Sequence, residues 1–395
     1  MQAAVFALVA ASFTAVYITQ PVLPVIRMEF AVSETTASLT VSAVILGIAM
    51  ANLPFGVLSD RYPIRPILLG GAAVVSAASL FCALTYGIWL LVAARFVQGL
   101  FIPALTTCLA AYLARSLPLE RLNVVMGSYV SATIAGGLGG RLLGGWIHPP
   151  LHWRYAFVTS AVLLAAATAA AVRLLPSEPA KRAPEEEGVG FLHLVSRAEV
   201  LRMLAVAFTA FFVFSAMFNY LPFYLSAPPI RASVRVVTLL YLAYVVGMVA
   251  GPLSGKLSNR LGSGPTMSLG AAVLAIAVTC TLVPSLGVVA ASLPAVCAGF
   301  FGMHAAALGT LNRRLTASRG RANSLYVLSY YLGGASGISA AGWAYTHAGW
   351  RGCVTLGVAV LLAPFGIGLF ETLRAKSRAS DRAALSDAIA GRRMP

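Results

Sequence analysis

Two arginines lie deep inside long apolar runs of this sequence, at Arg95 and Arg141. An arginine surrounded by hydrocarbon costs roughly 2.5 to 3.5 kcal/mol, so we expect neither side chain to face lipid. The twelve acidic residues all fall between the apolar runs or at their ends, which leaves both cations without a carboxylate at their depth. A cavity lined by such cations attracts anionic and neutral polar molecules and repels organic cations.

Gln98 lies one helical turn after Arg95, and His304 lies in a later apolar run. We expect Arg95 and Gln98 to line a central cleft or to couple the movement of an ion. For Arg141 a second interpretation stays open, in which the side chain reaches outward to the membrane surface. An imidazole gains and loses a proton near neutral pH, so His304 is a candidate proton relay; the alternative is a hydrogen-bonded packing histidine.

Five polar or aromatic residues occupy corresponding places in the first and seventh apolar runs: Tyr17, Gln20, Asn219, Tyr220 and Tyr224. Pro21 and Pro222 lie beside them and are expected to bend both helices near a central cavity. We expect the five side chains to line that cavity. A helix-packing face is the alternative, because tyrosine is common at membrane interfaces.

The apolar runs define the class of protein. Of the 395 residues, 59% are hydrophobic and 10% are charged, and the mean hydropathy is +0.85. Twelve apolar runs of about 20 residues recur, each long enough to cross a hydrocarbon core of about 30 Å. The runs are too long for barrel strands and lack the alternation of such strands. We therefore predict an all-α integral membrane protein with twelve transmembrane helices.

The sequence contains two copies of one six-run unit. The segment 56–66 returns half a chain later as 255–265, and the segment 136–146 returns as 333–343. This repetition predicts two pseudo-symmetric six-helix bundles. We expect an N-terminal bundle at 1–175, a polar linker at 176–200, a C-terminal bundle at 201–373 and a basic tail at 374–395.

Positive charge sets the expected orientation. Most of the 28 lysines and arginines lie on the side that carries the linker and the tail, so we expect that side and both termini to be cytoplasmic. The same bias explains the net charge of +16 without a nucleic-acid partner.

The five cysteines fall inside the runs or at their ends, with no spacing typical of a disulfide or metal site. We expect no cofactor and no bound metal.

Three motifs resemble those of the major facilitator superfamily. The loop pattern G-x-L-x-D-R-x-x-x-R is met by Gly56, Leu58, Asp60, Arg61 and Arg65. The pattern R-x-x-Q-G is met by Arg95, Gln98 and Gly99. The helix-packing glycines of the drug:proton antiporter branch are similar to Gly136, Gly140, Gly144 and Gly145, with Arg141 where that branch has proline.

The resemblance implies that the loop is a gate. Gly56 would let another helix approach, and Asp60 would accept hydrogen bonds from a helix N-terminus across the bundle. The second copy, at Gly255, Asn259 and Arg260, lacks the acid, so we expect a one-sided latch. A charged turn that only sets topology is the alternative.

The resemblance also implies a function. It indicates a secondary active transporter of a small organic solute, working by alternating access as a monomer in the bacterial inner membrane. The two arginines favour an anionic or neutral polar or amphipathic solute, and the branch favours proton-coupled efflux.

Three other functions are less consistent with the sequence. An importer of a solute or of copper is the main alternative, since the superfamily includes copper transporters and Met303 precedes His304. A non-transporting membrane sensor is less favoured, because the tail is too short for an added domain. An enzyme is not expected, because the sequence has no phosphate-binding loop and no Gly-x-Ser-x-Gly motif.

Overall fold

The computed structural model describes residues 2–117, 119–175, 190–315 and 319–391. The linker residues 176–189 and the side chain of Asp60 lie outside the described part. The N-terminal half comprises α1 (Gln2–Tyr17), η1 (Gln20–Val22), α2 (Leu23–Glu29), α3 (Glu34–Arg61), α4 (Ile64–Leu84), α5 (Ile88–Leu105), α6 (Thr107–Ser116), α7 (Leu119–Ile147) and α8 (Arg154–Leu174). The C-terminal half comprises α9 (Phe191–Ser196), α10 (Ala198–Ser226), α11 (Val234–Leu240), η2 (Tyr241–Ala243), α12 (Tyr244–Leu261), α13 (Ser263–Cys280), α14 (Leu286–Arg314) and α15 (Arg319–Gly391).

Twelve membrane crossings follow from these helices, which confirms the predicted fold class. Ten described stretches are long and apolar enough to span a bilayer. The last of them bends at Ala348 and Gly349, where Gly349 has a φ of 55°, and therefore supplies two crossings. The 29 residues of α7 complete the set, because at about 1.5 Å per residue they exceed the thickness of the hydrocarbon core.

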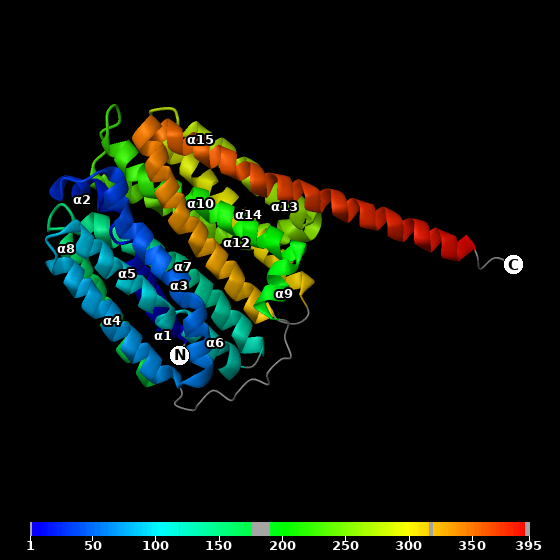
Figure 1. Cartoon of the computed structure of the whole chain (residues 1–395), viewed down its shortest axis with the longest axis horizontal. Helices are drawn as coiled ribbons and strands as arrows, with labels where there is room; N and C mark the ends of the chain where they lie inside the picture. The colour runs from blue at the N-terminus through cyan, green and yellow to red at the C-terminus, as the bar shows by residue number, and fades with distance from the viewer. Residues whose placement is uncertain (1, 118, 176–189, 316–318, 392–395) are drawn as a thin grey trace.

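The crossings run between two ends of the molecule. One end of the molecule carries the helix α9 and the turns at 62–63 and 262, and we call it the linker end. The opposite end carries the turns at 30–33 and 227–233, and we call it the far end. Figure 1 shows α9 and α2 at these opposite ends. The last helix continues past residue 374, where we expected a separate tail, and projects away from the bundle (Figure 1).

The two halves contact each other mainly through α3 against α15 and α7 against α11. At the far end the hydroxyl oxygens of Thr35 and Thr346 lie 3.4 Å apart, and Gly145 of α7 lies against Thr238 of α11. At the linker end, side chains added at Gly56 and Gly255 would meet nothing within 4 Å. No helix approaches Gly56 in this structure, because the halves meet nearer the far end, so the expected approach stays a prediction for the state in which the linker end is closed.

Glycines bring α7 against α1. A Cβ added at Gly136, Gly140 or Gly144 would overlap the backbone oxygens of Ala10, Thr14 and Ile18 respectively. The second half repeats this packing, since Gly333 and Gly337 of α15 lie against the backbone oxygens of Phe208 and Phe212 of α10. Small residues that allow close backbone approach are how membrane helices gain packing contacts.

Arg95 joins three helices of the N-terminal half. The guanidinium is fully buried, and it donates from Nε to the oxygen of Thr40 at 2.8 Å and from Nη1 to the oxygen of Ala15 at 2.6 Å. Nη2 donates to the oxygen of Val16, and Nη1 also donates to Gln98 Oε1 at 2.7 Å. The last carbonyls of a helix lack partners within it, and α1 ends at Tyr17, so Arg95 caps that helix.

In this structure Arg95 is buried among α1, α3 and α5 and lines no cleft, and its expected role in coupling stays a prediction. The N–H groups of its guanidinium donate to backbone oxygens, two of which belong to α1. Those two oxygens are free to accept because α1 ends at Tyr17. Gln98 is also fully buried and donates from Nε2 to Ser79 Oγ at 2.6 Å, which extends the same network to α4.

Replacing Gly140 by Ala should lower the unfolding temperature in detergent by several degrees, because overpacking typically costs about 1 to 3 kcal/mol. Gly139→Ala is the matched control, since a Cβ there would lie 3.6 Å from Thr14 Oγ1, an ordinary contact. Thermal unfolding followed by tryptophan fluorescence measures both. Equal unfolding temperatures for the two variants would show that the close approach of α7 to α1 is not needed.

Replacing Arg95 by Lys should also lower the unfolding temperature, because one ammonium group cannot reach the backbone oxygens that the guanidinium spans. Arg173→Gln removes an exposed charge from α8 and should leave stability unchanged. The same unfolding assay measures both variants. Loss of transport by Arg95→Lys at unchanged stability would contradict this structural role and assign Arg95 to the transport site.

Candidate functional site

Arg141 lies where the two halves meet. Its side chain is buried, and its Nε donates to Gln20 Oε1 at 2.6 Å on η1 of the N-terminal half. Its Nη2 donates to the hydroxyl of Tyr244 at 2.9 Å on α12 of the C-terminal half, and Nη1 donates to the oxygen of Gly137 at 2.8 Å. One guanidinium thus connects both bundles. The alternative in which Arg141 reaches outward to the membrane surface is wrong for this structure.

Three tyrosine rings surround the same guanidinium. Its central carbon lies 3.9 Å from the ring centre of Tyr17, 4.3 Å from that of Tyr244 and 5.4 Å from that of Tyr241. A cation over an aromatic face gains about 2 kcal/mol or more when water is excluded. The rings therefore replace part of the hydration that the buried cation has lost.

No carboxylate among the described residues contacts this site. Within the described residues, the ion pairs of Glu29 and Glu34 lie at the far end, and those of Glu199 and Glu371 lie at the linker end. The charge of Arg141 is thus met by neutral oxygens and by rings alone. A buried cation without a counter-ion is an attractive place for an anion to bind.

Two interrupted helices position the site. Pro21 lacks a backbone N–H, and the first crossing passes through the short helix η1, where Gln20 lies. The eighth crossing passes through η2, which carries Tyr241 and leads directly to Tyr244. Gly137 leaves room for Arg141, since a Cβ there would lie 3.3 Å from Nη1. Nothing in the sequence around Tyr241 and Tyr244 indicates a role in this site beyond their aromatic character.

A row of aromatic rings leads from Arg141 toward His304. The ring centres of Tyr244 and Phe214 lie 5.3 Å apart, and Phe214 stacks on Phe300 at 3.9 Å. Phe300 in turn lies 5.9 Å from the ring of His304 at an angle of 15°. His304 is partly exposed, and its Nδ1 lies 3.1 Å from the hydroxyl of Tyr326. His304 and Arg141 therefore belong to one aromatic wall without touching.

The remaining candidates divide into two groups. Asn219 and Tyr220 of α10 are fully buried, and neither side-chain amide atom of Asn219 has a hydrogen-bond partner in the structure. Tyr220 packs on Tyr345, with ring centres 5.3 Å apart. Tyr224 instead stacks on Trp350 at 4.6 Å and donates to the oxygen of Thr281. The expected cavity role of Tyr224 is therefore wrong here, because it packs inside the C-terminal half.

The gating-loop residues show no latch in this structure. Arg61, Asn259 and Arg260 are exposed at the linker end. Arg65 donates to the oxygen of Leu175 at 2.8 Å, a contact within the N-terminal half. The contact expected of Asp60 falls on a side chain outside the described part.

Known proteins match most of this chain. The sequence profile of the Major Facilitator Superfamily matches residues 5–312 and 230–390. The inner membrane transport protein YnfM of Escherichia coli strain K12 is 29% identical over 354 residues, which cover 88% of this chain and 85% of that protein. The uncharacterized MFS-type transporter YybF of Bacillus subtilis strain 168 is 26% identical over 358 residues, with 89% and 88% covered.

A solved structure shares the fold. The inward-facing, unoccupied crystal structure of a bacterial homolog to the human lysosomal transporter Spinster superimposes with a TM-score of 0.75 at 15% identity, covering 96% of this chain and 97% of that one. The profile match spans both halves of the helical fold described above. The chain therefore belongs to the major facilitator superfamily and is a membrane transporter, not an enzyme.

Proposed function

We propose that this transporter moves a small organic anion, or a neutral polar or amphipathic solute, by alternating access. The observation that supports this proposal is Arg141, a buried cation with neutral partners from both halves. We place the protein in the bacterial inner membrane, with the linker end and both termini in the cytoplasm, because most basic residues lie at that end.

Opening the far end must separate the two halves at Arg141. Gln20 would stay with the guanidinium, since both belong to the N-terminal half, whereas the hydroxyl of Tyr244 would leave with the C-terminal half. A buried hydrogen-bond donor left without an acceptor costs about 1 to 3 kcal/mol, more when it is charged. A bound anion or polar oxygen would replace the lost acceptor, so the solute would favour the state that exposes Arg141.

We propose proton-coupled efflux as the mode of transport. His304 is partly exposed beside the aromatic wall, so it is our candidate proton carrier. The glycine pattern of α7 supports efflux by its resemblance to the antiporter branch. In this chain that pattern packs α7 on α1 with Arg141 in place of the proline.

The alternative is an importer in the same superfamily, for a solute or for copper. The described residues contain no group of three His, Cys, Asp or Glu side chains that could hold a metal ion. Met303 is fully buried, and His304 contacts Tyr326. These contacts give the copper hypothesis less support than the organic-solute hypothesis, and a sensor role has no supporting contact.

Replacing Arg141 by Gln should lower solute counterflow in proteoliposomes at least about tenfold, because the charged donor is lost. Tyr244→Phe removes one acceptor and keeps the ring, so we expect an intermediate loss. The assay uses a panel of radiolabelled anionic, neutral and cationic organic solutes, with a pH-sensitive dye inside the vesicles to report proton movement.

Arg173→Gln, which removes an exposed charge, is the control and should transport like the unchanged protein. Undiminished flux in Arg141→Gln would contradict a role for Arg141 in solute transport. A preference for cationic solutes would contradict the proposed substrate class, and solute flux with no dye response would contradict proton coupling.

A further inference from the structure

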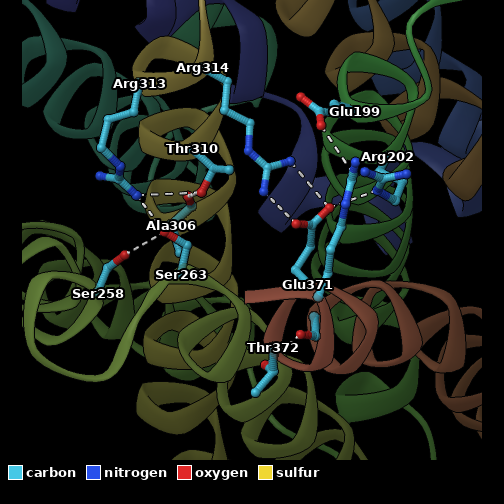
Figure 2. Close-up of polar contacts among 12 residues, drawn as sticks. Glu199, Arg202, Ser258, Ser263, Ala306, Thr310, Arg313, Arg314, Glu371 and Thr372 are labelled. Carbon is cyan, nitrogen blue, oxygen red and sulfur yellow. Dashed lines mark hydrogen bonds and ion pairs between the residues drawn. The ribbon is translucent and has the colours of Figure 1, made fainter. Parts of the chain in front are cut away.

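A charged cluster joins three helices at the linker end of the C-terminal half, away from Arg141. Glu371 of α15 is buried and accepts from Arg202 Nε of α10 at 2.7 Å and from Arg314 of α14. Glu199 of α10 pairs with Arg374 at 3.0 Å. Figure 2 shows Glu371 between the side chains of Arg202 and Arg314, with Glu199 near Arg202.

A cavity of about 360 Å³ opens beside this cluster. One wall is the first turn of α10 and the other is the end of α14, and the lining residues are Arg197, Ala198, Glu199, Val200, Leu311, Arg314 and Leu315. A water molecule takes up about 30 Å³ in the liquid, so the cavity can hold a group much larger than a single ion or water. Each wall carries both charged and apolar side chains, with Arg197 and Val200 on the α10 side and Arg314 and Leu311 on the α14 side.

Positive charge exceeds negative charge around the cavity. Glu371 is shared between Arg202 and Arg314, and Glu199 is taken by Arg374. Arg197 makes no side-chain hydrogen bond or ion pair with the described residues, and Nη2 of Arg202 is buried without a hydrogen-bond partner among them. The N-terminus of α10, a helix of 29 residues with no side-chain cap, adds further positive potential.

The helix α9, directly before the cavity, indicates where the occupant comes from. Its Leu192 is 87% exposed and its Phe191 is 41% exposed, and the exposed Arg197 follows directly after the last residue of α9, Ser196. Large apolar side chains beside a cation at the end of a transmembrane bundle are typical of a segment that lies in the membrane interface. Figure 1 shows α9 at that end of the bundle.

We propose that this cavity binds the phosphate group of an anionic phospholipid of the phosphatidylglycerol class. Arg197, Arg314 and the first turn of α10 hold the phosphate, and Val200, Leu311 and Leu315 contact the glycerol and the start of the acyl chains. Basic pockets between helices on the cytoplasmic side of membrane proteins bind such headgroups. The lipid ties α10 to α14 and stabilises the C-terminal half in proportion to its occupancy.

The test uses the full chain in nanodiscs of phosphatidylcholine, with and without phosphatidylglycerol. Phosphatidylglycerol should raise the unfolding temperature, and native mass spectrometry should detect retained phosphatidylglycerol. Arg197→Gln should weaken retention about tenfold, since a charge-assisted contact is lost. Ala198→Glu should do the same without weakening α10, because an acid suits the first turn of a helix but repels phosphate. Arg173→Gln, a charge loss at the same end, should retain the lipid as the unchanged protein does.

Equal retention and equal stabilisation in the unchanged protein, Arg197→Gln and Ala198→Glu would overturn the proposal. Inorganic phosphate is added to phosphatidylcholine nanodiscs as a separate arm, and full stabilisation by phosphate alone would overturn the assignment to a lipid. Unfolding temperatures in phosphatidylcholine alone show whether each variant folds. Since Arg197 and Ala198 make no contact with the Glu371 carboxylate, both variants should fold.

Discussion

The contact between the two halves centres on Arg141, a buried cation with no carboxylate partner among the described residues. Arg141 is held by an amide oxygen, a backbone oxygen, a phenol and the faces of tyrosine rings. These neutral partners stabilise the guanidinium but leave its positive charge in place. The site therefore keeps a positive potential in a medium of low dielectric constant. Because these partners come from both bundles, the interaction that stabilises the cation also connects the two halves.

The backbone around Arg141 is built to allow this arrangement. Glycines of α7 let it approach α1 closely enough for Arg141 to stack on Tyr17, and Gly137 leaves space for the guanidinium. The interrupted helices η1 and η2 present Gln20 and Tyr241 at the same level. The second half repeats the glycine packing, but Ile338 lies where the repeat has Arg141, so the charge is on one side only.

Much of the fold was predictable from the sequence, because composition and the internal repeat both report burial in lipid. The site was predictable only in part. Arg141 is conspicuous as a charge inside an apolar run, but its ring partner Tyr244 lies about a hundred residues away and carries no local signal. The burial of Arg95 within one half could not be predicted, because its hydrogen-bond acceptors are backbone oxygens at the end of α1. The residue at which a helix ends is poorly defined by sequence. The stacking of Tyr224 on Trp350, in place of the expected cavity position, could not be predicted either, because only tertiary packing brings the two rings together.

If Arg141 and Tyr244 hold the far end closed, the loss of Arg141 lets the two halves separate there. The distance between spin labels at Met28→Cys and His347→Cys reports this separation, because both are exposed far-end positions in opposite halves; Cys280 is replaced by Ser. Double electron–electron resonance in nanodiscs compares the unchanged Arg141 with Arg141→Gln. We expect the distance distribution to shift to longer distances when Arg141 is lost. An unshifted distribution would contradict a role of Arg141 in closing the far end.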